Sequence, residues 1–243
     1  NVPWLMVRRK PRISILATGD EIVMPGDPIG RDQIVSSNAL SLSAFISALG
    51  GEPTDLGIAP DEENELKALA AGARGSDILV TTGGASVGDH DLVQGVLGDI
   101  GLKVDFWRIA MRPGKPLMFG RIDGTFLIGL PGNPVSSLVC AIMFLAPAIR
   151  TMLGMADVMP EKITVRLGAE LEESDEREDY LRATLTRDDT GSLVATPFAK
   201  QDSSMFATIA RADALIIREP FSGAAKTGDA VRIIPLKGSI FSI

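Results

Sequence analysis

The sequence has a single cysteine, Cys140, and a single histidine, His90. One cysteine excludes an intrachain disulfide and a metal cage built from thiolates. One histidine excludes a zinc site made of several imidazoles, and it leaves His90 as the only base for a Ser-His-Asp triad. Any metal ion must therefore be held mainly by carboxylates and other oxygen ligands, which favours magnesium.

Positive charge and long apolar runs are also scarce. The 24 Lys and Arg residues face 31 Asp and Glu residues, and the net charge of −7 argues against a nucleic-acid partner. The longest apolar stretch, residues 135–149, contains two serines and a proline and is shorter than the roughly 20 residues of a transmembrane helix. The first residues lack the pattern of a signal peptide. We therefore expect a cytoplasmic protein with no membrane partner.

Apolar runs and amphipathic segments alternate over the first part of the chain. Strands are expected at residues 12–18, 54–59 and 77–82, each followed by a helix. This order is typical of a parallel sheet covered by helices on both faces. Further strands are expected at 104–110, 117–121 and 125–130, before a helix from Pro134 to about Leu153 that starts at Asn133.

From Met159 onwards the pattern changes to short strand-like runs separated by turns, which predicts a small, mostly β domain. One helix is expected at about 204–211. Residues 170–179 contain seven acidic residues and one arginine. We interpret this acidic run as a solvated loop between two strands.

Four polar or glycine-rich loops leave the carboxyl ends of predicted strands: residues 18–21, 82–91, 112–116 and 131–134. Ligands bind at this edge of an open parallel sheet. Glycines let the backbone approach an anion, helix N-termini offer N–H groups, and Arg112 with Lys115 supplies positive charge. Glu21 and Asp91 are candidate magnesium ligands. The combination predicts a phosphorylated or otherwise anionic substrate.

Each loop also has a purely structural interpretation. Glu21 could be solvated, the two glycines after Thr82 could form an ordinary turn, and Asp91 could cap a helix. Arg112 and Lys115 could be solvated cations. Only the joint occurrence of these loops at one sheet edge favours a site.

The motifs TGDEI, SSN, TTGGASVGDHD, RPGKP and LPGNPVSS occur in this order. They resemble the molybdopterin-binding domain of the MoeA and gephyrin E-domain family, the molybdopterin molybdotransferases. The resemblance covers residues 11–155, and residues 160–240 are similar to the family's C-terminal domain through motifs such as DYLRATL. It implies an α/β class fold: a three-layer domain with a parallel-type sheet, like MoaB and Mog, followed by a small mostly β domain. Family members usually carry two further N-terminal domains, so residues 1–10 are predicted to be a linker.

The resemblance implies molybdenum cofactor biosynthesis, with adenylylated molybdopterin and molybdate as substrates, Mg²⁺ as cofactor and AMP as a product. It also implies a homodimer in the full-length protein and contact with the molybdopterin adenylyltransferase. The implied catalytic residues are Glu21, Ser86 and Asp91, of which Glu21 and Asp91 hold the metal. The implied substrate-binding residues are Thr18, Gly19, Asp20, Thr82, Gly83, Gly84, Gly88, Pro131, Gly132 and Asn133. The implied molybdate-binding residues are Arg112, Pro113, Gly114, Lys115, Arg182 and Ser204, with Ser203 as the alternative serine.

Two alternatives stay open. One is a MogA-type molybdopterin adenylyltransferase, which would consume ATP and against which the β-rich tail argues. The other is a non-catalytic pterin-binding or scaffolding module. Arg112 stands where the family commonly has a lysine, and an arginine keeps the charge but changes the contact geometry. Without the two further domains, the chain is expected to bind a pterin ligand but to catalyse poorly.

Overall fold

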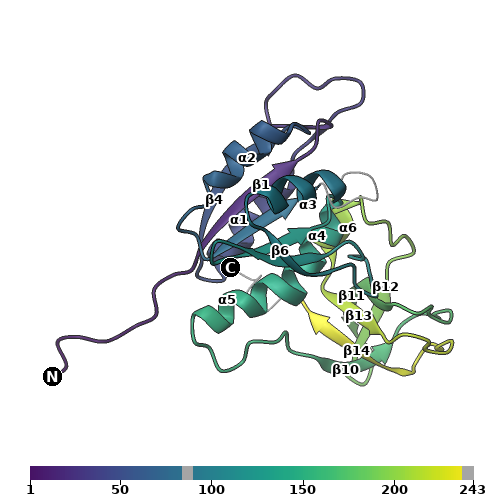
Figure 1. Ribbon diagram of the computed structural model, residues 1–243. Helices are drawn as coiled ribbons and strands as arrows, with labels where there is room; N and C mark the ends of the chain where they lie inside the picture. The colour runs from purple at the N-terminus through teal and green to yellow at the C-terminus, as the bar shows by residue number, and fades with distance from the viewer. Residues whose placement is uncertain (84–89, 237–243) are drawn as a thin grey trace.

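The computed structural model describes residues 1–83 and 90–236, with the side chains of residues 90–94 excepted. The first domain contains a six-stranded sheet in the order β4-β1-β5-β9-β8-β6 (Figure 1). Strands β4 (Glu52–Ala59), β1 (Arg12–Thr18), β5 (Ile78–Thr82) and β9 (Thr125–Leu130) are parallel. Strand β8 (Met118–Ile122) is antiparallel to both β9 and the edge strand β6 (Lys103–Trp107), so the sheet is mixed at this end.

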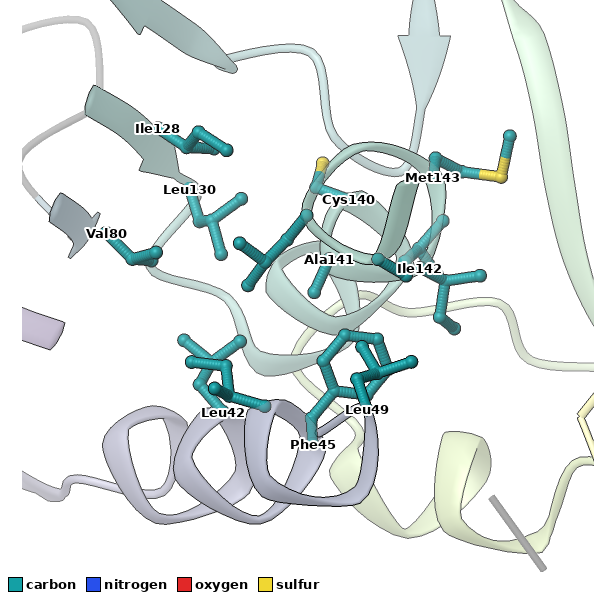
Figure 2. Packing of buried hydrophobic residues seen from close by; sticks show 14 of the residues in the cluster. Leu42, Phe45, Leu49, Val80, Ile128, Leu130, Cys140, Ala141, Ile142 and Met143 are labelled. Atoms are coloured by element: carbon teal, nitrogen blue, oxygen red, sulfur yellow. The ribbon is translucent and has the colours of Figure 1, made fainter. Parts of the chain in front are cut away.

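Helices cover both faces of this sheet, which confirms the predicted three-layer arrangement. On one face, α1 (Asn38–Ala48) and the helix after β9 pack on Val80, Ile128 and Leu130 (Figure 2). On the other face, α2 (Glu63–Ala71) and α3 (His90–Asp99) pack on Leu16 and Leu79. The side chains of the central strands are buried on both faces, which explains why these strands have continuous apolar runs in the sequence.

The helix after β9 has the bounds that the sequence predicted, to within one residue. It comprises α4 (Pro134–Cys140), the π-helical turn η1 (Ala141–Leu145) and α5 (Ala146–Met152). The π-helical turn ends two residues before Pro147, whose missing N–H interrupts the helical hydrogen bonds. With 19 residues the helix is long and apolar enough, by length and composition, to cross a membrane, so the expectation that every apolar stretch is too short was wrong. It lies in the main hydrophobic cluster, with 61% of its apolar window buried inside the molecule.

The second domain is a small barrel of five strands. Its strands are β10 (Ile163–Leu167), β11 (Glu178–Arg187), β12 (Leu193–Pro197), β13 (Ala214–Arg218) and β14 (Ala230–Pro235). Their order is β12-β10-β14-β13-β11, and β12 also pairs with β11, which closes the barrel. The helix α6 (Phe206–Arg211) precedes β13. A core of small and branched apolar residues fills the barrel, including Val165, Leu167, Ile216 and Ile233.

The two domains share a strand and a hydrophobic core. The two-residue strand β7 (Met111–Arg112) of the first domain pairs in parallel with β11, and Arg112 lies opposite Asp179. The main hydrophobic cluster also includes Tyr180, Leu215 and Ile217 of the second domain. The domains are therefore packed together through both backbone pairing and apolar contacts.

The acidic run lies mainly in the loop between β10 and β11, as the sequence predicted, and four of its acidic residues are exposed: Glu170, Glu172, Glu173 and Glu176. The loop is anchored by Arg218, whose guanidinium donates to the carbonyl oxygen of Glu172. The end of the run departs from the prediction, because Asp179 is only 3% exposed and belongs to β11. Charge composition alone does not show which carboxylate meets a cation.

Residues 1–10 have no helix or strand and extend away from the sheet (Figure 1). Arg9 fixes the end of this segment through two hydrogen bonds of 2.7 and 2.6 Å to the carboxylate of Asp77. This contact lowers the pKa of Asp77. A small two-stranded sheet, β2 (Ile22–Val23) with β3 (Ile34–Val35), lies near the carboxyl end of β1.

Candidate functional site

A cleft of about 1020 Å³ lies where the carboxyl edge of the first sheet meets the second domain. Four of its walls come from the predicted loops: Glu21, Thr82 with Gly83, residues 111–116 and residues 131–134. Two further walls come from residues 34–38 and from residues 201–204 with Phe206 of the second domain. The structure therefore brings the predicted loops together, as the sheet-edge argument requires.

The turn at residues 112–116 follows β6 and bends sharply towards the second domain. The N–H of Ile109 donates to the carbonyl of Lys115, and that of Arg108 donates to the carbonyl of Leu117, each at 3.0 Å. Gly114 has a φ of +122° and packs against Cys140, which lies beneath the turn. Burial raises the pKa of the Cys140 thiol, so this side chain stays neutral and serves in packing.

Lys115 is the free cation of this turn. Its side chain is exposed and lines the cleft, and within the described residues its ammonium has no hydrogen-bond or ion-pair partner. An ammonium that no described side chain neutralises attracts anions to a concave site. This placement suits the oxyanion contact that the sequence predicted for Lys115.

Arg112 lines the cleft too, but its guanidinium is engaged. Its Nε and Nη2 donate to the two carboxylate oxygens of Asp179 at 2.7 and 2.5 Å, and its Nη1 donates to Asp175 at 3.1 Å. Arg177, a further cleft residue, forms two hydrogen bonds to the same Asp175. These bonds, chiefly those from Arg177, lower the pKa of Asp175 to about 2. The four side chains form a charge-balanced cluster at the cleft wall.

The start of α4 is capped by the second domain. Asn133 occupies the N-cap position, but its side chain makes no cap hydrogen bond and instead donates to the Ser203 hydroxyl at 3.0 Å. The carbonyl of Ser203 accepts the N–H of Val135 at 3.1 Å. Asn38 donates from Nδ2 to the carbonyl of Gly132 at 2.7 Å. The predicted helix start is confirmed, and its first N–H group is satisfied by a residue far away in the sequence.

Two glycines let the first loops approach the cleft. A Cβ on Gly19 would clash with the carboxylate of Glu21, which folds back over this residue. A Cβ on Gly83 would clash with the carbonyl of Thr18. Both glycines have positive φ, a conformation that other residues adopt at a cost.

Some predicted residues lie just outside the cleft lining. Thr18 is buried behind it, and Asp20 accepts the N–H of Asp61 at 3.0 Å, close to the start of α2. Arg182 is 1% exposed, and burial lowers its pKa. Its Nη2 donates at 3.2 Å to the carbonyl of Asp202, which does line the cleft.

Ser204 lines the cleft and donates to the Asp202 carboxylate at 2.8 Å. Gly84, Ser86 and Gly88 lie outside the described residues, and so does the side chain of Asp91, whose backbone belongs to the first turn of α3. In the part of the chain that the structure describes, no group of three or more His, Cys, Asp or Glu side chains could hold a metal ion.

The sequence-based list missed several cleft residues. Ser36, Ser37 and Asn38 form the SSN motif of the family resemblance but were not among the predicted site residues. Arg177 was assigned to the acidic loop. The remaining missed residues include Ser136, Gln201, Asp202 and Phe206. The SSN motif was a usable signal, whereas the loop at 201–206 has no distinctive pattern.

The chain matches two family models that divide it as the structure does. The family described as probable molybdopterin binding domain matches residues 14–151, and the MoeA C-terminal region (domain IV) matches residues 164–236. The chain belongs to the MoeA family. This finding confirms the family and fold class that the motifs implied.

Relatives of the MoeA family agree with this assignment. The chain is 33% identical to a molybdopterin molybdenumtransferase of Haemophilus influenzae, over 93% of this chain and 56% of the relative. It is 32% identical to one of Bacillus subtilis, over 95% of this chain and 54% of the relative. A crystal structure of a molybdopterin biosynthesis MoeA protein from Pyrococcus horikosii superposes with a TM-score of 0.80 at 31% identity, over 94% of this chain and 55% of that chain. The chain thus spans about half the length of the relatives it matches.

Proposed function

We propose that this MoeA-family chain acts in molybdenum cofactor biosynthesis by inserting molybdate into adenylylated molybdopterin, with release of AMP. The observation that carries the proposal is the cleft itself. The cleft is lined by loops of the first domain that offer backbone groups, by the free ammonium of Lys115 and by residues of the second domain. The relatives' names point to the same reaction, and the MoeA-type second domain argues against a MogA-type adenylyltransferase.

We assign the cleft residues by their chemistry. Thr82, Gly83 and the loop at 131–134 offer backbone and hydroxyl groups to the phosphate-bearing pterin. Lys115 offers positive charge to molybdate. Ser203 and Ser204 lie on the opposite wall and supply hydroxyl groups to the same oxyanion. Arg182 supports this wall from behind through the carbonyl of Asp202.

Magnesium is proposed as the cofactor, with Glu21 and Asp91 as its ligands. Glu21 is a carboxylate at the cleft, and the described residues offer no closed cage of metal ligands. This fits an ion that keeps several waters and is bound through one or two carboxylates plus substrate phosphates. When bound there, the ion would neutralise charge on the phosphate oxygens.

The test is incubation of the chain with adenylylated molybdopterin, molybdate and magnesium, followed by measurement of released AMP. We expect AMP release that depends on all three additions and is lost in Lys115→Met. Lys162→Met is the matched control, because Lys162 is exposed and does not line the cleft. Tight binding of the adenylylated pterin without AMP release would instead identify a binding module. The absence of both pterin binding and AMP release would refute the proposal.

A homodimer of the full-length protein and contact with the molybdopterin adenylyltransferase stay predictions that follow from the family, and a cytoplasmic location stays a prediction from the sequence. Analytical ultracentrifugation of the full-length protein tests the dimer. A monomer's sedimentation coefficient across the micromolar range would contradict it.

A further inference from the structure

The pair Arg112–Asp179 joins the two domains at the wall of the cleft. In the parallel pairing of β7 with β11, these two residues lie directly opposite each other. The guanidinium contacts both oxygens of Asp179, and a third nitrogen contacts Asp175. The side chain of Asp179 is 5% exposed, whereas that of Arg112 is 46% exposed. The carboxylate is therefore buried and depends on Arg112 for its neutralisation.

This arrangement limits what else Arg112 can bind. A guanidinium between two carboxylates attracts an oxyanion less than a free cation does. Moving it towards a ligand would leave the buried Asp179 carboxylate unpaired, which is strongly unfavourable. Lys115, three residues later in the same turn, has no ion-pair partner among the described residues.

We propose that Arg112 and Asp179 form a positioning pair, which fixes the turn at residues 112–116 against the second domain so that Lys115 meets the oxyanion. This inference rests on the proposed function and deepens it. It assigns the oxyanion charge of this turn to Lys115 and gives Arg112 an indirect role. It also explains why an arginine suits position 112 here, because a lysine cannot contact both oxygens of Asp179 in the same way.

Asp179→Asn separates this role from direct binding by Arg112. A positioning pair predicts that loss of the carboxylate loosens the turn and weakens molybdate binding by about tenfold. Direct binding by Arg112 predicts tighter molybdate binding instead, since Asp179→Asn would free the Arg112 guanidinium to contact an anion in the cleft. Arg112→Lys keeps the positive charge, so direct binding predicts near-normal affinity. A positioning pair predicts that Arg112→Lys loses about as much molybdate affinity as Asp179→Asn.

The experiment is calorimetric titration of the chain with molybdate, for the wild type, both single variants and the double variant. For a coupled pair, the double variant should bind no more weakly than either single variant. Arg232→Lys is the matched control: Arg232 is also 46% exposed, lies in the same sheet as Arg112 and pairs with a carboxylate, Glu219, away from the cleft. It should bind like the wild type. Tighter binding by Asp179→Asn, or additive losses, would overturn the proposal.

Amide hydrogen exchange without any ligand gives a second, independent readout. The N–H groups of Arg108 and Ile109 are protected only by bonds across the turn, to Leu117 and Lys115. We expect both amides to exchange about tenfold faster in Asp179→Asn and unchanged in the control. If the wild type binds no molybdate, the proposed function fails, but the exchange data still decide the positioning role. Unchanged exchange in Asp179→Asn would overturn it.

Discussion

Gly114→Ala tests whether the turn beside Lys115 is fixed by close packing on the long helix. Gly114 has a φ of +122°, and an added Cβ would clash with the Met111 methyl group and lie 2.5 Å from the Cys140 sulfur. The backbone strain costs about 1–3 kcal/mol. Overpacking against the sulfur adds about 1–3 kcal/mol. We therefore expect Gly114→Ala to lower the free energy of unfolding by about 4 kcal/mol.

Part of the clash can be separated from the backbone strain, because Cys140→Ala removes the sulfur and leaves the Met111 methyl group in place. Cys140→Ala alone should cost about 1–2 kcal/mol, as expected when buried volume is removed from a core. The double variant should be more stable than the sum of the single losses predicts, by about 2 kcal/mol, since the added methyl group occupies the space of the sulfur. Gly26→Ala is the control: Gly26 has a φ of +100°, and a Cβ there would meet nothing within 4 Å.

The assay is equilibrium unfolding in urea, with the same probe for all four variants. Gly26→Ala should show only the strain cost, about 1–3 kcal/mol. Additive losses for Gly114→Ala and Cys140→Ala, within about 0.5 kcal/mol, would refute close packing as the cause. The same result would mean that packing on the helix does not fix the turn, and a fixed position for Lys115 would no longer be expected.

Two other perturbations test the contacts around the cleft. Asp175 has its pKa lowered from 3.8 to about 2, first by Arg177, so its ion pairs stabilise the fold above pH 3.8 and this stabilisation is lost as the pH falls through about 2. The free energy of unfolding should therefore be higher for the wild type than for Asp175→Asn near neutral pH. Measured at decreasing pH, this difference between the two proteins should vanish by about pH 2. A difference that stays constant with pH would contradict the prediction. Asn38→Ala removes the donor to the Gly132 carbonyl and should cost about 1–2 kcal/mol in urea unfolding. Asn38→Asp, which keeps the shape but not the donor, should be equally destabilised, and a stable Asn38→Asp would refute the role of this bond.

The sequence predicted the first domain well because its signals are local. The runs at residues 12–18 and 125–130 are mainly apolar, and the strands occur with those bounds. Pro134 after Asn133 marked the start of the long helix correctly. The sheet-edge rule then placed Glu21, Thr82 and the loops near residues 112–116 and 131–134 at one cleft, because it depends only on strand direction.

The predictions that failed or fell short depend on contacts between distant segments. Strand β7 has two residues, too few for any periodicity, so its pairing with β11 could not be predicted. Without that pairing, Arg112 appeared to be a free cation and Asp179 part of a solvated acidic run. Ser203 was likewise expected only as a candidate oxyanion contact, and its capping of α4 depends on how the two domains meet.

The second domain shapes the cleft by holding parts of the first domain. Asp179 fixes Arg112, and the carbonyl of Ser203 caps α4. A first domain without these contacts would keep its sheet and helices, since its core on the α2 and α3 face is its own. Its turn at residues 112–116 and its loop at 131–134 would each lose a partner. The sheet therefore determines where the cleft lies, and the second domain determines whether Lys115 and the start of α4 face it together.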